Sequence, residues 1–109
     1  MTLRTFIHSS AKRAETLALL DSGATENFLN LDYAKYLKLP IKNFDQPRKL
    51  YNVDGTENQA GELRHYTDLT VQTGSRKVTM RFMLSNLGEQ RAILGYPWFA
   101  AMQPQIDWA

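Results

Sequence analysis

The chain has 109 residues, which is the size of one compact domain. Thirteen Lys and Arg against eleven Asp and Glu give a net charge of +2, and the basic residues form only short pairs, so a dedicated nucleic-acid arm is not expected. The lack of cysteine excludes disulfides, thiolate nucleophiles and Cys-bound metals, and two His are too few for a histidine-rich metal site. No apolar run approaches the roughly 20 residues that cross a bilayer, and the start lacks a secretory signal, so we expect a soluble intracellular chain. Any chemistry must then come from carboxylates, hydroxyls and backbone amides.

The N-terminal part of the chain predicts a strand that ends in a tight turn. Glu15–Leu20 is a β-like apolar run, and we expect its last four residues, Leu17–Leu20, to be buried. The run stops at Asp21-Ser22-Gly23, which is typical of a turn. His8 precedes the run in a polar stretch, where a solvated hairpin loop is a simpler interpretation than catalysis; the same holds for His65.

Two short helices are expected. The first covers Asn30–Leu39, with Asn30 as its N-cap, and Pro40 ends it. The second begins at Tyr96-Pro97, because proline suits the first helical turn. Trp98 is expected in the core, although it could instead contact a partner subunit.

Strands joined by turns fill the middle of the chain. Asp68–Gln72 and Lys77–Met83 alternate apolar and polar residues, and residues 73–75 join them as a hairpin. Lys49–Asn58 predicts a second hairpin, because Asp54-Gly55 is a favoured turn pair. The short spacing of the turns predicts a single all-β domain over residues 1–109, with one or two short helices.

The most informative stretch for chemistry is Asp21-Ser22-Gly23-Ala24-Thr25. A carboxylate directly after buried apolar residues lies at the edge of a low-dielectric core, where ionisation is costly. A simpler interpretation is that Asp21 caps a turn by accepting bonds from backbone amides two residues on. The late run Ala92-Ile93-Leu94-Gly95 repeats the pattern of a short apolar strand followed by glycine, so the two strands could meet beneath one site.

The combined order of these motifs resembles the retropepsin family, the aspartic proteases of retroviruses and LTR retrotransposons, and most closely its gypsy-type branch. The resemblance runs from about Glu15 to Trp108, and it implies a closed β-barrel or sandwich half-site with a flap hairpin. The segments that carry it are the catalytic motif Leu17–Thr25, its continuation in Glu26–Leu29 and the helix before Leu39-Pro40-Ile41, the later Ile93–Gly95, the flap-like Tyr51–Thr56, and the end segments Gly95–Phe99 and Pro104–Trp108.

The resemblance implies a role for each matching residue. Asp21 would supply the catalytic carboxylate, Ser22 the hydroxyl that locks two active-site turns together, and Gly23 a carbonyl for the substrate. Residues implied to line the substrate cleft are Leu19, Ala24, Thr25, Phe28 and Ile93, and those implied to form the flap are Val53, Asp54, Gly55 and Thr56. Asp54 is better interpreted as a turn former than as an acid, and neither a metal nor a cofactor is implied.

One departure from the family concerns an ion pair. In the best-known retroviral members an Arg follows the Ile-Gly and pairs with an acid four residues after the catalytic Asp. The matching positions here hold Tyr96 and Thr25. A dimer must therefore be supported by other contacts, or be weaker.

The chemistry requires a second carboxylate. Peptide hydrolysis without a metal or a covalent intermediate uses one carboxylate as base for water and another as acid for the substrate carbonyl, and two carboxylates about 3 Å apart share one proton. The sequence holds a single Asp-Ser-Gly, so a twofold homodimer would build the pair from Asp21 of both chains. We therefore expect an aspartic endopeptidase that cleaves extended peptides of a retrotransposon-type polyprotein, in the cytoplasm or a virus-like particle, without nucleic-acid or membrane partners.

Three other functions fit parts of the sequence. A retropepsin-like module adopted by its host could be catalytically silent and act in binding or dimerisation, although the intact Asp21-Ser22-Gly23 shows no decay. A Ser9 or Ser10 nucleophile with a His and an Asp would lack the Gly-x-Ser-x-Gly elbow. A nucleic-acid-binding β-barrel would need exposed aromatics interleaved with a basic stripe, which the sequence does not show.

Overall fold

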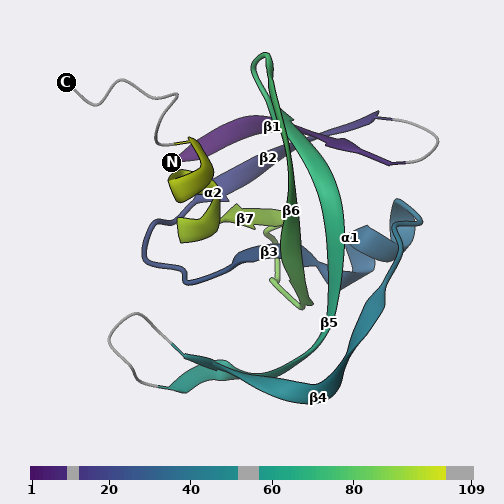
Figure 1. Ribbon diagram of the computed structural model, residues 1–109, viewed down its shortest axis with the longest axis vertical. Coiled ribbons are helices and arrows are strands. Elements are labelled where there is room, and N and C mark those ends of the chain that lie inside the picture. The colour runs from purple at the N-terminus through teal and green to yellow at the C-terminus, as the bar shows by residue number, and fades with distance from the viewer. Residues whose placement is uncertain (10–12, 52–56, 103–109) are drawn as a thin grey trace.

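The computed structural model describes residues 1–9, 13–51 and 57–102. Most of these residues lie in strands, and two short helices accompany them (Figure 1). In chain order the elements are β1 (Thr2–His8), β2 (Arg13–Leu20), β3 (Asn27–Asn30), α1 (Leu31–Tyr36), β4 (Lys42–Tyr51), β5 (Glu57–Thr73), β6 (Arg76–Ser85), β7 (Ala92–Leu94) and α2 (Tyr96–Met102).

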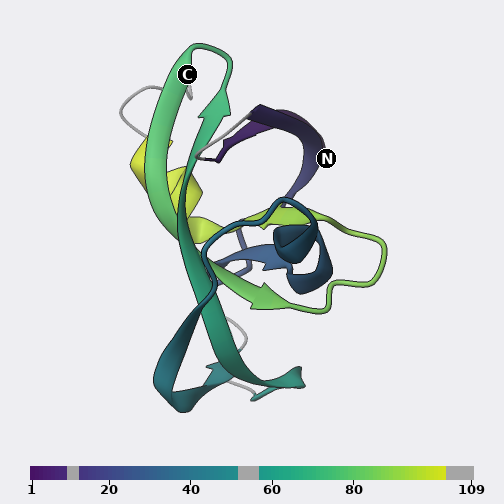
Figure 2. The same ribbon diagram turned by 90° about the vertical axis from the view of Figure 1, so that its right-hand side faces the viewer.

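The strands form a closed barrel. Their order in the sheet is β1-β2-β7-β3-β6-β5-β4, and β1 also pairs with β5 over Phe6↔Gln72 to His8↔Thr70. This extra pairing closes β1, β2, β7, β3, β6 and β5 into a ring and leaves β4 outside it. Figure 2 shows β4 and the paired end of β5 extending away from the barrel. The predicted all-β barrel with a projecting hairpin is thus confirmed.

The barrel is filled by alternate residues of its strands. The largest fully buried side chains of this core are Phe82, Ile7, Leu29, Leu94 and Val71. Helix α2 contributes Trp98 and Met102, each 5% exposed, to the same cluster. The expectation that Trp98 is a core residue is confirmed, and α2 begins at Tyr96 as predicted.

Helix α1 has the predicted N-cap but ends earlier than expected. Asn30 Oδ1 accepts the N–H groups of Asp32 and Tyr33, at 2.9 and 3.3 Å. The helix ends at Tyr36 rather than at Leu39, because Lys38 adopts a φ of +58°. The Lys38 and Leu39 N–H groups then donate back to the carbonyls of Lys35 and Ala34, which is a Schellman ending without the usual glycine.

The expected burial of Leu17–Leu20 is wrong for most of that run. Ala18 is fully buried, Leu19 and Leu20 are half-buried, and Leu17 is 61% exposed. The reason is that β2 has only one face on the barrel core, so alternate side chains point outward, as in any strand buried on one side. The apolar run in the sequence did not show whether one face or both faces of the strand would be buried.

Both predicted hairpins are present. Thr73 pairs with Arg76, so the β5–β6 turn is only Gly74-Ser75, one residue shorter than expected, and Gly74 has a φ of +60°. The β4–β5 hairpin is paired as far as Tyr51↔Glu57, with register shifts along its length. Its predicted turn, Asp54-Gly55, lies outside the described residues.

Ion pairs of Asp68 on β5 with Arg81 on β6 and Lys42 on β4 predict a dependence of stability on pH. Asp68 accepts from Arg81 Nε at 3.0 Å and lies 3.6 Å from Lys42 Nζ. The hydrogen bond from Arg81, more than any other contact, lowers the pKa of Asp68. The native state therefore favours the ionised carboxylate, so this contribution is complete above the unfolded value of about 3.9 and is lost as pH falls through the lower native value.

We expect Asp68→Asn to reduce the free energy of unfolding at pH 7 by about 0.5 kcal/mol, since the group is largely exposed. The difference from wild type should shrink as pH falls through the lowered native pKa of Asp68. Urea denaturation from pH 2.5 to 7 measures it, and Asp45→Asn, at an exposed carboxylate on β4, is the control. A constant difference at all pH values would contradict the assignment.

Candidate active site

The turn after β2 holds Asp21 in a fixed orientation. The Asp21 N–H donates to the Leu94 carbonyl at 3.0 Å, so β2 keeps its pairing with β7 for one residue beyond the strand. The chain then turns, and the Gly23 N–H donates to Asp21 Oδ1 at 3.1 Å. The turn-capping role of Asp21 is therefore real. An ionised carboxylate has about four acceptor sites, so one such bond orients it and leaves acceptor capacity for another group.

All three residues of the Asp21-Ser22-Gly23 turn are exposed in the single chain. The expectation that Asp21 lies against a low-dielectric core therefore fails for one chain alone. The physical reason is that the turn stands beyond the end of β2, whose outer face is itself open. A second surface placed over the turn would be needed to exclude water from it.

The corner between β7 and α2 packs directly against this turn. The Tyr96 N–H donates to the Ala24 carbonyl at 2.9 Å. Gly95 is buried, and a Cβ at this position would overlap the carbonyl oxygen of Glu26. Gly95 is therefore required by close backbone approach. The two apolar-strand-then-glycine segments do meet, as parallel neighbours with Leu19 opposite Ile93.

Asn27 anchors the same corner, and sequence reasoning missed it. Its side chain is fully buried, with Oδ1 accepting the Gly95 N–H at 2.9 Å and Nδ2 lying 3.3 Å from Met80 Sδ. It thus satisfies a buried backbone donor that has no strand partner. The available signal was a polar residue directly before the apolar pair Phe28-Leu29 at the start of a strand.

Of the residues expected to line a cleft, the structure brings three together. Ala24, Phe28 and Ile93 belong to a second apolar cluster, separate from the barrel core, that also includes Leu63 and Met83. Phe28 is only 7% exposed, so it serves as packing beneath this surface. Leu19 is half-buried and outside both clusters, and Thr25 is exposed; these two are not part of the group.

The predicted flap residues Val53, Asp54, Gly55 and Thr56 lie outside the described residues. The parts of the hairpin that lead to them are described, up to Tyr51 and from Glu57. Figure 1 shows this end of the β4–β5 hairpin on the same side of the molecule as the turn after β2. Phe44 and Tyr66 of this hairpin pack with their ring centroids 4.6 Å apart and belong to the second cluster.

The prediction that the two histidines lie in solvated loops is wrong. Both occupy half-buried positions in strands. His8 Nε2 lies 2.8 Å from Gln72 Oε1, and His65 Nδ1 lies 2.6 Å from Asn43 Oδ1. Each ring is thus held by an amide side chain.

Within residues 1–9, 13–51 and 57–102, no group of three or more His, Cys, Asp or Glu side chains could hold a metal ion. In the same part of the chain, no helix has the length and apolar character to cross a bilayer.

The Asn27 contact predicts a specific loss of stability. Asn27→Ala leaves the buried Gly95 N–H without an acceptor, so we expect the free energy of unfolding to fall by about 1–3 kcal/mol. Asn86→Ala is the matched control, because Asn86 Oδ1 accepts a glycine N–H, that of Gly88, at 3.0 Å on the exposed surface. Water can replace that bond, and a loss within about 0.5 kcal/mol is expected. Equal losses in urea denaturation would show that Asn27 does not anchor the corner.

Comparison with known proteins agrees with this architecture. The fold is similar to that of EIAV protease complexed with the inhibitor HBY-793, with 17% identity over 94% of this chain and 88% of that chain, and a TM-score of 0.69. It is also similar to the retroviral protease-like domain of Ddi1 from Leishmania major, with 14% identity, 94% and 76% coverage, and a TM-score of 0.56. Both likenesses establish a retropepsin-like fold. A family model for the PEG10/RTL1 protease domain matches residues 17–109, and the chain therefore belongs to this family of retropepsin-like protease domains of retrotransposon origin.

Proposed function

We propose that this chain is an aspartic endopeptidase that acts as a homodimer, with one Asp21 from each subunit. The observation that carries the proposal is the exposed Asp21-Ser22-Gly23 turn, held by backbone bonds to β7, in a member of a protease-domain family. An exposed turn with a fixed carboxylate can meet its symmetry mate without rearranging the barrel. A twofold axis through this turn would also supply the surface that the single chain lacks.

The reaction requires one ionised and one protonated carboxylate. In the proposed dimer, the ionised Asp21 takes a proton from water as the water oxygen attacks the scissile carbonyl carbon. The protonated Asp21 of the other subunit donates to the carbonyl oxygen, giving a neutral tetrahedral intermediate. Proton transfer to the leaving nitrogen then breaks the C–N bond. Two carboxylates close together hold one proton between them, because both cannot ionise at that distance.

Substrate would bind as an extended strand between the turn and the β4–β5 hairpin. Hydrogen bonds between the main chains of substrate and protein would form with a peptide of any sequence. Alternate side chains of the substrate would enter pockets of the protein. Ala24 and Ile93, in the second apolar cluster, favour apolar side chains close to the scissile bond. A polyprotein of the retrotransposon type is the proposed natural substrate, and Ser22 is proposed to bond across the two turns.

Assembly predicts that activity depends on protein concentration. If the site is shared, diluting a mostly monomeric sample tenfold should lower the cleavage rate per chain roughly tenfold, by mass action. Sedimentation over the same concentrations should show the dimer fraction falling in parallel. A chain that stays monomeric and still cleaves peptides at a constant rate per chain would contradict the shared site.

Asp21→Asn should reduce peptide cleavage by about 10⁴-fold, because it removes both the base and the acid. Dimerisation should persist, since repulsion between the two carboxylates is also removed. Wild-type cleavage should follow a bell-shaped pH profile with an acidic to near-neutral optimum, bounded by loss of the ionised base and loss of the shared proton. Asp32→Asn, at an exposed carboxylate in the first turn of α1, should leave this profile unchanged.

The assay uses a pool of extended peptides, with a mimic that carries a central hydroxyl as inhibitor. Persistent cleavage by Asp21→Asn would move the chemistry away from this residue. A wild-type dimer that binds the mimic yet cleaves no peptide would favour the alternative function, a silent binding or dimerisation module.

A further inference from the structure

Among the described residues, strand β2 has a free edge over its first five residues, Arg13–Leu17. It pairs with β1 from Arg13 to Leu19, but with β7 only from Ala18 to Leu20. The pairing with β7 begins at Ala18↔Ala92, and residues 89–91, which precede it, form no ladder with β2. No other strand of the described chain pairs with Arg13–Leu17 on that side.

The hydrogen-bonding groups of this edge can be assigned by alternation. The Leu20 N–H donates to Met1 on the β1 side, and the Asp21 N–H donates to Leu94 on the β7 side. Successive residues of a strand point their backbone groups to opposite neighbours. The N–H and C=O groups of Arg13, Glu15 and Leu17 therefore face the open side.

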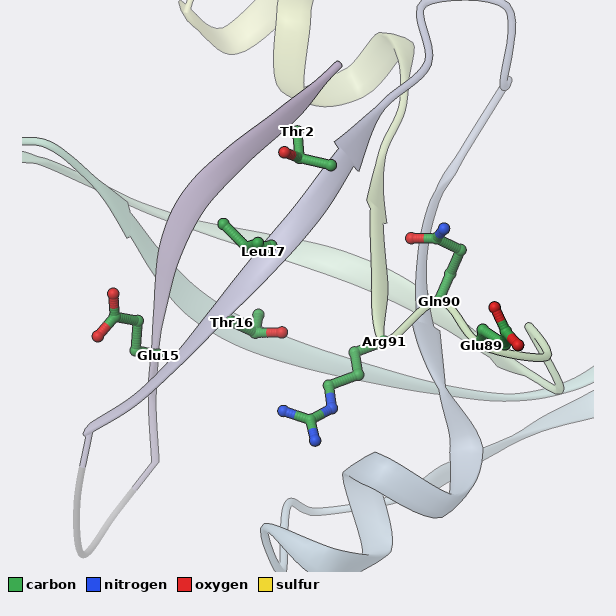
Figure 3. Close-up of a pocket in the computed structure, with 7 residues that line it drawn as sticks. All are labelled: Thr2, Glu15, Thr16, Leu17, Glu89, Gln90 and Arg91. Carbon is green, nitrogen blue, oxygen red and sulfur yellow. The ribbon is translucent and has the colours of Figure 1, made fainter.

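A groove lies beside the free edge. It has a volume of about 490 Å³ and is open to solvent. Figure 3 shows β2 on one side and the start of β7 on the other, and the Arg91 guanidinium lies over the Tyr33 ring of α1, 5.0 Å from its centroid. The lining residues are Thr2, Glu15, Thr16, Leu17, Glu89, Gln90 and Arg91. The groove occupies the position that β7 would fill if it continued along β2.

The outward side chains of the edge specify what could pair with it. Arg13, Glu15 and Leu17 all lie on the exposed face, and Glu15 is already paired with Arg4 at 2.8 Å. Across an antiparallel pair, opposite charges and apolar contacts stabilise directly facing positions. A matching strand therefore carries an acidic residue opposite Arg13, a neutral one opposite Glu15 and an apolar one opposite Leu17.

We propose that the free edge of β2 docks an extended peptide segment by strand addition, with the pattern apolar-x-neutral-x-acidic read antiparallel to β2. Unpaired backbone groups supply the affinity and the alternate side chains supply the selectivity. A second copy of this chain fits less well, because twofold pairing centred on the edge places Glu15 opposite Glu15. The docking site is distinct from the Asp21 turn and requires no cleavage.

The test titrates the full ¹⁵N-labelled chain with the end-blocked peptide Thr-Val-Thr-Thr-Thr-Glu-Thr. The amide signals of Arg13, Glu15 and Leu17 should shift and exchange with solvent more slowly. Exchange at Ala14 and Thr16 should not change, because their N–H groups already face β1. A peptide with Val and Glu interchanged should bind about two- to fivefold more weakly.

Two test variants and one control variant separate docking from a general surface effect. Arg13→Glu should weaken binding about two- to fivefold, the range of one cross-strand charge pair, whereas Lys35→Glu on the exposed side of α1 should not. Leu17→Pro removes an outward N–H and should abolish binding while the β1 ladder stays intact. If Leu17→Pro changes amide signals throughout the NMR spectrum, the chain is misfolded, and the effect of Arg13→Glu on peptide binding is then the test of the proposal.

Three results would overturn the proposal. The first is unchanged exchange at all three outward amides with peptide at millimolar concentration. The second is a set of shifts confined to Asp21–Ala24, which would place the peptide at the proposed catalytic turn. The third is the same shifts on concentrating the chain without peptide, which would assign the edge to a second copy.

Discussion

The hydrogen bond from the Gly95 N–H to Asn27 Oδ1 is the contact on which the arrangement of the candidate site depends. It joins the start of β3 to the corner that leads from β7 into α2. Because Gly95 has no side chain, the carbonyls of Glu26 and Ala24 can approach that corner closely. The Asp21 turn is then fixed by bonds to the residues on either side of Gly95, Leu94 and Tyr96. One buried amide therefore sets the geometry that the exposed carboxylate needs.

Closure of the barrel connects this end of the molecule to the hairpin. Strand β5 is 17 residues long, and it pairs with β6 and β1 in the barrel and with β4 beyond it. A single strand thus runs from the core into the hairpin that projects on the side of the Asp21 turn (Figure 1). The hairpin needs no independent core, because the barrel sets its direction and Phe44 and Tyr66 pack at its base.

The features predictable from sequence were those encoded within a few residues. The Asn30 cap, the start of α2 at Tyr96 and the β5–β6 hairpin each follow from a local turn or capping signal. The role of Asn27 could not be predicted in this way, because its partner Gly95 is 68 residues distant in the chain. The exposure of Leu17 was missed for a related reason, since which face of β2 is covered depends on strands far along the chain.

The absence of the retroviral ion pair would change what holds two subunits of the proposed dimer together, but it does not change what holds the Asp21 turn of one chain. At the position of the retroviral Arg, Tyr96 binds the Ala24 carbonyl through its backbone N–H, a bond that any residue except proline can make. Its ring is 61% exposed, at the corner that packs against the Asp21 turn. A dimer that joins two such turns would bring these rings near its interface. Apolar burial there would not be screened by salt as an exposed ion pair is, so in the proposed dimer the exchange of Arg for Tyr would replace an electrostatic contact with a hydrophobic one.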